Sequence, residues 1–264
     1  MTVLTEYAVK ARNIDPASDN KIHDDEVARQ FGFVGALVPG VELFAYLTHP
    51  LVDAWGEEFL RQGSIDVRFR QPVYDGELVV ALATPGSASD AVDLELRGDD
   101  GSVRSTGHAA PVAERPADLD RFTETPMSAT LRDPTPPALP PGPLGSIEEP
   151  VDEAAGDSYL AAIAETLPLY REHGIVHPGA LLRMVNAVLV RNVRLGPWIH
   201  TSSRCTLLDI ARLPTTLRAH ALVTETFERN GHDYVRYDAL VLSDDKPVMY
   251  VDHTAIYKVA PAGS

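Results

Sequence analysis

The sequence predicts an α+β protein in which two similar halves each wrap an antiparallel sheet around a central helix. Three observations support this prediction. A proline-rich segment divides the chain, the two halves repeat a short pattern, and in each half one apolar helical stretch precedes four strand-like runs. The 264 residues suffice for one large domain or two small ones.

The division of the chain lies in the proline-rich segment. Nine of the 21 prolines stand between residues 115 and 150. Because proline has no backbone N–H to donate, this segment is predicted to be an extended strap rather than a helix or a strand. We therefore predict an N-terminal unit over residues 1–114, a linker strap over 115–150 and a C-terminal unit over 151–264.

A repeated pattern relates the two units. Gly35-Ala-Leu-Val-Pro-Gly40 parallels Gly174-Ile-Val-His-Pro-Gly179, and an apolar helical stretch follows each of them. Near the ends of the units, His108 and His253 stand in similar surroundings. The offsets of 139 and 145 residues differ by a small insertion, which indicates duplication of one unit.

Local patterns predict each element. Residues 24–31 and 157–172 are expected to form short helices, and residues 41–47 and 180–193 the central helices. Alternation of apolar and polar residues and the turn pair Asn230-Gly231 indicate antiparallel strands joined by hairpins. The predicted strands are Ser64–Gln71, Glu77–Ala83, Ala91–Leu96, Val103–Val112, Trp198–Leu208, Thr216–Glu228, His232–Leu242 and Pro247–Val259.

The composition argues against several classes of protein. With 23 basic and 38 acidic residues the net charge is −15, so the chain lacks the basic footprint that nucleic acid and anionic membranes require. The longest uncharged run, residues 134–147, is too short to span a bilayer, and the chain starts without a basic and apolar leader. A single cysteine, Cys205, allows no intrachain disulfide. We therefore expect a cytoplasmic protein.

The segment Ala17-Ser-Asp-Asn-Lys-Ile-His23 holds the most informative residues. It is followed by Gly40 at the predicted start of the central helix, and residues 67–77 read Val-Arg-Phe-Arg-Gln-Pro-Val-Tyr-Asp-Gly-Glu. In Asn20, Ile22, His23, Gly40 and this later run, the chain resembles the MaoC-like (R)-specific enoyl-thioester hydratases and dehydratases. The resemblance to their double-hotdog members covers nearly the whole chain outside the linker strap.

This resemblance implies a fold, a reaction and a set of site residues. The fold is a double hotdog, in which the two helix-plus-sheet halves share one continuous sheet. The reaction is the reversible hydration of a 2-enoyl thioester to a 3-hydroxyacyl thioester, carried by CoA or an acyl carrier protein, with no cofactor or metal ion. His23 is expected to be the general base and acid, Asn20 to orient the water or the histidine loop, and the Gly40 N–H to polarise the carbonyl, with Ser18 and Asp19 as auxiliary groups. A homodimer is also implied.

Elementary chemistry agrees with two of these roles. An unperturbed histidine has a pKa of about 6.5, so His23 can accept a proton unaided. A glycine at a helix start lets a ligand approach the free N–H groups and the positive end of the helix dipole, which suit a developing enolate oxygen.

The motif also departs from the family pattern. The catalytic aspartate of the family would stand where this chain has Ser18, Asp19 is one residue out of register, and Lys21 replaces a proline. Three alternatives remain: Asp19 moves into place, His23 works alone, or the reaction has changed. A changed reaction would be isomerisation, cyclisation or thioester hydrolysis, and a non-catalytic acyl-thioester-binding protein is a further alternative.

A phosphate-bearing carrier needs local cations despite the acidic balance. Arg183, Arg191 and Arg194 lie roughly on one side of the second central helix and just after it, and Arg68 and Arg70 share one face of a strand. The first three are the predicted carrier-binding residues. The second unit has no Asn-x-x-His segment before its Pro-Gly pair, so we predict one active site per chain.

The remaining reactive residues are expected to be structural. His173 and His177 have the spacing of helical metal ligands, but His177 precedes Pro178, which disfavours a helical conformation there. No metal site is therefore predicted. Cys205 is expected to be a small buried side chain, and His108 and His253 to be satisfied structural histidines.

Overall fold

The computed structural model describes residues 6–14, 20–86, 90–133 and 139–260. Within these residues the strands are β1 (Tyr7–Lys10), β2 (Ser64–Phe69), β3 (Leu78–Pro85), β4 (Val92–Gly98), β5 (Val103–Ala110), β6 (Gly142–Pro143), β7 (Ile147–Val151), β8 (Ile199–Leu207), β9 (Thr215–Arg229), β10 (His232–Ser243) and β11 (Lys246–Lys258). The helices are the 3-10 turn η1 (Lys21–His23), α1 (Asp25–Gln30), α2 (Gly40–Gln62), α3 (Glu153–Ala162), α4 (Leu169–Glu172) and α5 (Pro178–Asn192).

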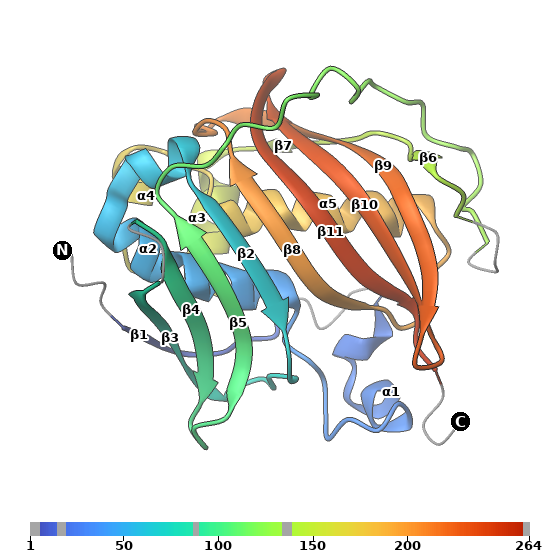
Figure 1. Cartoon of the computed structure of the whole chain (residues 1–264), viewed down its shortest axis with the longest axis horizontal. Helices are drawn as coiled ribbons and strands as arrows, with labels where there is room; N and C mark the ends of the chain where they lie inside the picture. Colours follow the sequence, from blue (N-terminus) through green and yellow to red (C-terminus); the bar gives the residue numbers. More distant parts are fainter. Residues whose placement is uncertain (1–5, 15–19, 87–89, 134–138, 261–264) are drawn as a thin grey trace.

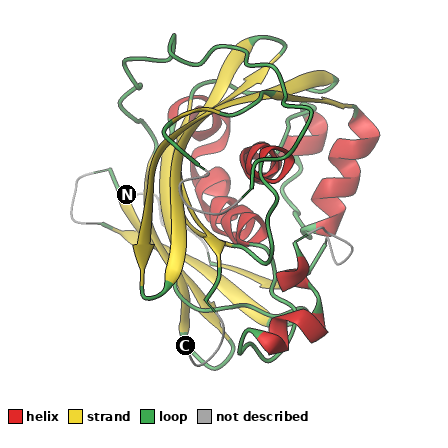
Figure 2. Cartoon of the chain, turned by 90° about the vertical axis from the view of Figure 1, so that its right-hand side faces the viewer, coloured by secondary structure: helices red, strands yellow, loops and turns green. Residues whose placement is uncertain are grey.

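One continuous antiparallel sheet connects the two halves of the chain. The strand order is β1-β3-β4-β5-β2-β8-β11-β10-β9-β6, and β7 also pairs with β9 (Figure 1). The halves join where β2 pairs with β8, from Ser64 opposite Thr206 to Arg68 opposite Ser202. The sheet curves around the helices, which lie on one of its faces (Figure 2). This is the predicted arrangement of two helix-plus-sheet halves with a shared sheet.

The central helix of the N-terminal half of the chain, α2, is buried on all sides along its N-terminal part. Every residue from Val41 to Val52 is buried, which is typical of a core helix rather than an amphipathic surface helix. Gly56 leaves the helical conformation (φ 58°), so two helical segments meet there at a kink. The helix is therefore much longer than the stretch 41–47 that the sequence predicts.

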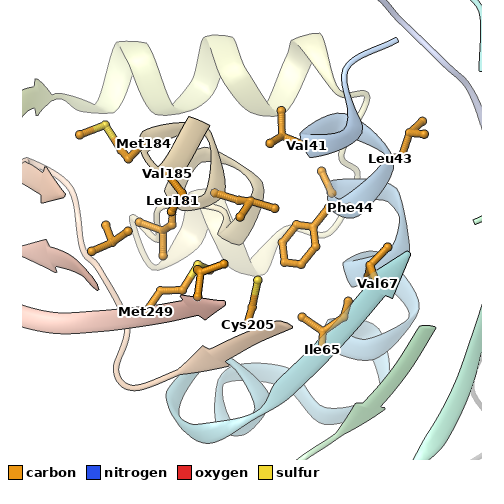
Figure 3. Packing of buried hydrophobic residues seen from close by; sticks show 14 of the residues in the cluster. Val41, Leu43, Phe44, Ile65, Val67, Leu181, Met184, Val185, Cys205 and Met249 are labelled. Atoms are coloured by element: carbon orange, nitrogen blue, oxygen red, sulfur yellow. The ribbon is translucent and has the colours of Figure 1, made fainter. Parts of the chain in front are cut away.

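The second central helix, α5, packs beside α2 in the same core. Pro178 occupies its first turn, where a missing N–H costs nothing. Phe44 of α2 and Val185 of α5 face strand residues such as Cys205 and Met249 (Figure 3). A single hydrophobic cluster thus spans both halves and ties the helices to the sheet.

The predicted linker strap contains two short strands. β6 and β7 both pair with the outer edge of β9, so the last part of the strap belongs to the sheet of the second half. Pro143 and Pro150 are compatible with this because they lie in edge strands, where a ladder hydrogen bond can be missing. Earlier in the strap, Phe122 packs on Leu240, which faces away from the central helices.

The predicted elements are otherwise close to those observed. The strands of the second half, β8 to β11, differ from their predicted bounds by at most one residue at either end. The predicted helix 157–172 is replaced by α3 and α4, because the chain turns at Ala164, which has a positive φ of 57°. No strand was predicted where β1 lies.

The proposed equivalence of His108 and His253 is wrong in side-chain direction. His108 is exposed on β5 and pairs with Asp93 at 2.7 Å, whereas His253 is fully buried on β11. The two strands are equivalent in the sheet, but the aligned residues point to opposite faces. Of these two histidines, His253 is buried and His108 is not.

Among the helices that the structure describes, none combines the length and the apolar character that crossing a bilayer requires.

Candidate active site

His23 is held with a basic nitrogen available to the site. Its Nδ1 lies 2.7 Å from the carbonyl oxygen of Leu37, and because a carbonyl only accepts, Nδ1 must carry the hydrogen. In the neutral ring Nε2 is therefore an acceptor, and Asn20 Nδ2 donates to it at 3.2 Å. This is the tautomer that a general base requires.

Asn20 fastens the histidine loop to the second half of the chain. Its side chain is buried, donates to the carbonyl oxygen of Trp198 at 3.0 Å and accepts from the Trp198 N–H at 3.2 Å. The same Oδ1 accepts from the N–H of Ile22 at 3.3 Å. The geometry thus favours the loop-holding role among the two expected for Asn20. Ser18 and Asp19 lie outside the described residues.

Gly40 begins α2 next to His23. No side chain caps this helix end, and the first N–H groups of an α-helix have no intrahelical acceptor. Gly40, the first residue of the helix, lines the same cavity as His23. A Cβ at position 40 would lie 3.0 Å from both His200 Nδ1 and Phe69 Cε2. Glycine is needed here because two rings pack against the start of the helix.

A cavity of about 610 Å³ brings these residues together, a size in the range of small-molecule sites. Among the described residues, its lining contains His23, Asn20 and Gly40 and no carboxylate. A second cavity, of about 570 Å³, runs along α3, α5 and β7. The two cavities share five lining residues and so meet at His23: Asn20, His23, Pro39, Asn186 and Trp198.

The second half supplies site residues that the sequence did not predict. Trp198 contributes its backbone, a contact that no sequence pattern marks. Asn186 contributes an amide whose Oδ1 is buried without a hydrogen-bond partner. His200 lines the first cavity with a buried ring. For Asn186, one signal was available, since it is an amide in the otherwise apolar run 184–190.

The arginines divide between the two cavities. Arg68 and Arg70 line the first cavity together with Arg229 and Arg236 from the β9–β10 hairpin, and all four are exposed. Arg183 and Arg191 line the second cavity, where they pair with Glu42 at 2.5 Å and with Glu149 at 3.0 Å.

Arg194, the third predicted carrier-binding residue, follows α5 and lines neither of these cavities. The three predicted carrier-binding arginines therefore do not form one cluster, since Arg183 and Arg191 line the second cavity and Arg194 does not.

The equivalent position in the second half cannot bind a carbonyl oxygen. The N–H of Gly179 donates to Nδ1 of His177 at 3.0 Å, so the helix end is already capped. A Cβ at Gly179 would lie 2.3 Å from the hydroxyl of Tyr159, which fills the space above the glycine. The geometry therefore agrees with the prediction of one site per chain.

The other reactive side chains have structural surroundings. His173 is the C-cap residue of α4, and its Nδ1 contacts Glu57 Oε1 at 2.5 Å. It is therefore placed as the partner of a carboxylate and not as a metal ligand together with His177. No group of three or more metal-ligating side chains occurs in the part of the chain that the structure describes. Cys205 is fully buried, as predicted, and burial raises the pKa of its thiol well above the ordinary value.

Comparison with known proteins identifies the fold. No protein-family model matches the sequence. No curated protein matches it either. Solved structures do match, along nearly the whole chain. A protein of Chloroflexus aurantiacus described as a MaoC-domain dehydratase is 12% identical, with a TM-score of 0.64 over 98% of this chain and 96% of its own.

Two further structures come from Mycobacterium tuberculosis. A conserved hypothetical protein described as a double hotdog is 14% identical, with a TM-score of 0.58 over 97% of this chain and 96% of its own. The dehydratase domain of PpsC, solved with C12:1-CoA, is 12% identical, with a TM-score of 0.51 over 95% of this chain and 92% of its own. Other similar structures are described as thioesterases. The chain has the double hotdog fold.

Proposed function

We propose that this double hotdog hydrates 2-enoyl thioesters and dehydrates 3-hydroxyacyl thioesters, with His23 as its one general base and acid. The observation that carries the proposal is the pairing, in one cavity, of an acceptor nitrogen on His23 with the helix-start N–H of Gly40. The first can take a proton from water and the second can stabilise an oxyanion. Dehydratases among the similar structures support this reaction class.

In the hydration direction, water lies against His23 Nε2 and its oxygen attacks C3 of the enoyl group. One proton of the water passes to Nε2, and the electrons of the C2–C3 double bond move towards the carbonyl group. The resulting enolate oxygen accepts a hydrogen bond from the Gly40 N–H. C2 then takes the proton from Nε2, which yields the 3-hydroxyacyl thioester and neutral His23. Dehydration follows the same steps in reverse.

Two amides assist this base. Asn20 gives up its 3.2 Å bond to Nε2 when water binds, and keeps the bonds to Trp198 that hold the loop. Asn186 lies where the two cavities meet, and its unpartnered Oδ1 accepts the second hydrogen of the water. An amide orients water but takes no proton. No carboxylate lines the first cavity among the described residues. Since a second acid or base is typically worth about 10²–10⁴ in rate, we expect slow turnover where His23 acts alone.

The exposed arginines of the first cavity suit the carrier of the thioester. Arg68 and Arg229 have no ion-pair partner among the described residues, while Arg236 pairs with Glu225 at 3.0 Å. A phosphate of CoA or of a phosphopantetheine arm would neutralise Arg68 and Arg229. The thioester then enters from the first cavity, and the acyl chain extends past His23 into the second.

Thioester hydrolysis is the second candidate, because thioesterases also occur among the similar structures. The same two groups would serve it. His23 would activate water against the carbonyl carbon, and the Gly40 N–H would hold the oxyanion of the tetrahedral intermediate. The products distinguish the two reactions, since hydrolysis releases a free thiol and hydration does not.

The test follows the enoyl-thioester absorbance of trans-2-butenoyl-CoA and trans-2-octenoyl-CoA, together with a thiol assay. We expect loss of the enoyl absorbance without thiol release, and a fall in kcat of about 10²–10⁴ in His23→Ala. His108→Ala is the matched control, because His108 is an exposed histidine of the same half outside the cavity.

Each other outcome has a definite meaning. Thiol release that depends on His23 would show that the protein hydrolyses the thioester and does not hydrate it. Binding of the enoyl-CoA without either product would make the protein an acyl-thioester-binding protein. Equal turnover in wild type and His23→Ala would remove His23 from the mechanism.

A further inference from the structure

A chain of three buried polar side chains lies in the core behind Gly40. Ser203 Oγ is 2.7 Å from His200 Nε2 and 2.9 Å from His253 Nδ1. The relative exposures of His200, Ser203 and His253 are 6%, 1% and 0%. The two imidazole rings are stacked, with centroids 4.1 Å apart. Burying polar groups in an apolar core is costly unless they are hydrogen-bonded, and Ser203 supplies a partner to one nitrogen of each histidine.

A β-bulge places His200 in this chain. In the ladder with β11, Ser202 pairs with Thr254 and His200 pairs with Ala255, so Thr201 has no partner residue. Regular alternation would turn residue 201 inward beside Ser203. The extra residue turns His200 inward instead. Bulges of this kind re-aim side chains and are common next to active sites.

Ser203 couples the tautomers of the two histidines, because its hydroxyl has one hydrogen to donate. If Ser203 donates to His200 Nε2, then His200 carries its hydrogen on Nδ1, and His253 donates to Ser203 from its own Nδ1. If Ser203 donates to His253, both rings take the opposite tautomer. The histidine to which Ser203 donates thus decides whether His200 Nδ1 is a donor or an acceptor.

The His200 end of this hydrogen-bonded series borders the site, whereas the other end, His253 Nε2, is buried without a hydrogen-bond partner among the described residues. His200 Nδ1 is buried and has no hydrogen-bond partner among the residues that the structure describes, and it lies 3.0 Å from the point that a Cβ of Gly40 would occupy. The rings of Phe69 and His200 are in an edge contact, with centroids 4.7 Å apart, and Phe69 Cε2 also lies 3.0 Å from that point at Gly40. Burial lowers the pKa of His200 to about 3 and that of His253 well below its ordinary value. Both rings are therefore neutral near pH 7.

We propose that the Nδ1–H of His200 is a second donor, with the N–H of Gly40, to the carbonyl oxygen of the bound thioester. Phe69 turns aside when the thioester enters and makes room at Nδ1. The carbonyl oxygen accepts from Nδ1–H, and this selects the direction in which Ser203 donates to His200. A neutral imidazole N–H can polarise a carbonyl without bringing a positive charge into the core. The inference rests on the proposed function and gives Ser203 and His253 a positioning role.

Two substitutions separate the two ring nitrogens. In His200→Asn the side-chain amide takes the place of Nδ1, and in His200→Gln it takes the place of Nε2. We expect His200→Gln to lower kcat on trans-2-octenoyl-CoA by about 10²–10³-fold, with KM little changed, and His200→Asn to restore part of the loss. His220→Gln is the matched control, because His220 is also a buried histidine bonded to a serine, Ser146, but lines neither cavity.

Spectroscopy tests the contact directly. Octanoyl-CoA labelled with ¹³C at the thioester carbonyl can be neither hydrated nor dehydrated, because it has no C2–C3 double bond and no 3-hydroxyl group. Its carbonyl band should shift to lower frequency when it binds to wild type. The shift should shrink in His200→Gln and remain in His200→Asn and His220→Gln. In wild type, ¹⁵N shifts of the histidine side chains should show a hydrogen on His200 Nδ1 in the octanoyl-CoA complex. This measurement needs no folded variant.

The results also separate this inference from the proposed function. Suppose that wild type turns over octenoyl-CoA. The role of His200 is then overturned if the carbonyl band is the same in wild type and His200→Gln, or if His200 Nδ1 has no hydrogen in the complex, and the proposed hydratase function is unaffected. Failure of wild type to bind octanoyl-CoA or to turn over octenoyl-CoA overturns both.

Discussion

At the scale of single residues, one substitution decides which half of the chain has a site. The two helix starts read Val38-Pro-Gly40 and His177-Pro-Gly179. His177 caps the N–H of Gly179 with its Nδ1, whereas the side chain of Val38 has no atom that could accept a hydrogen bond from Gly40. The same backbone motif is thus a closed helix cap in one half and an open donor in the other.

Gly40→Ala tests the open donor. The added Cβ lies 3.0 Å from His200 Nδ1 and Phe69 Cε2, a contact that forces the rings apart and fills the space beside the N–H. We expect a fall in kcat of at least about 10-fold on trans-2-octenoyl-CoA, since one misplaced oxyanion donor is worth about 10²–10³. Gly196→Ala is the control, because a Cβ there meets nothing within 4 Å. Equal kcat values for the two variants would argue against a carbonyl site at Gly40.

At the scale of elements, local signals predicted the strands but not how they contact each other. The β9–β10 hairpin was predicted within one residue because Asn230 and Gly231 both adopt the positive φ of a tight turn. β7 was not predicted, because its proline-containing sequence is a strand only by pairing with the edge of β9. The bulge at Thr201 is likewise a property of the ladder with β11.

The residues of the candidate site divide in the same way into those that a local pattern predicts and those that only the fold brings together. Asn20, His23 and Gly40 lie within 21 residues of one another, so a linear motif predicted them, and they do line one cavity. Trp198 reaches Asn20 across 178 positions of the chain. Contacts of this length depend on the pairing of β2 with β8, which no local pattern encodes.

The two central helices are also joined by a buried charge. Glu165 is 6% exposed, accepts from His49 of α2 at 2.8 Å and lies 3.5 Å from His177 at the start of α5. Burial by itself raises the pKa of Glu165, but hydrogen bonds from His177 and His49 outweigh it and hold the pKa below its ordinary value. The neighbouring Tyr7 and Tyr170 stay neutral, because burial and Glu165 raise their pKa.

Glu165→Gln therefore changes how stability depends on pH. Because the folded-state pKa is lowered, the stabilisation by ionised Glu165 is fully present above its ordinary pKa of 4.5. It is lost progressively as the pH falls from that value towards the lower folded-state pKa. We expect the free energy of unfolding of the variant to be lower than that of wild type by up to about 3 kcal/mol at pH 7, and this difference to be smaller at pH 4. Urea unfolding at both pH values measures it. The exposed Glu114→Gln should show no gap, and a gap in Glu165→Gln that is the same at both pH values would contradict the role of the charge.

At the scale of the whole molecule, the site belongs to neither half alone. The first half supplies His23 and Gly40, and the second supplies Asn186, His200 and the backbone of Trp198. The mouth of the first cavity is also exceptional in charge. The chain carries a net charge of −15, yet this mouth presents four exposed arginines and no carboxylate among the described lining residues. This local excess of positive charge would attract the phosphates of the carrier that we propose for the thioester.

Arg68→Gln and Arg229→Gln test whether the carrier phosphates bind at this mouth. Exposed charge pairs contribute up to about 1 kcal/mol, so each substitution should raise KM for trans-2-octenoyl-CoA about 2- to 5-fold and leave kcat unchanged. The KM of wild type for the CoA substrate should rise with ionic strength, because salt screens exposed charges. With trans-2-octenoyl-pantetheine, which has no phosphate, KM should be the same in wild type and both variants. Arg191→Gln is the comparison variant, because Arg191 lines the second cavity. A rise in KM confined to Arg191→Gln would place the carrier in the second cavity and reverse the direction in which the thioester lies past His23.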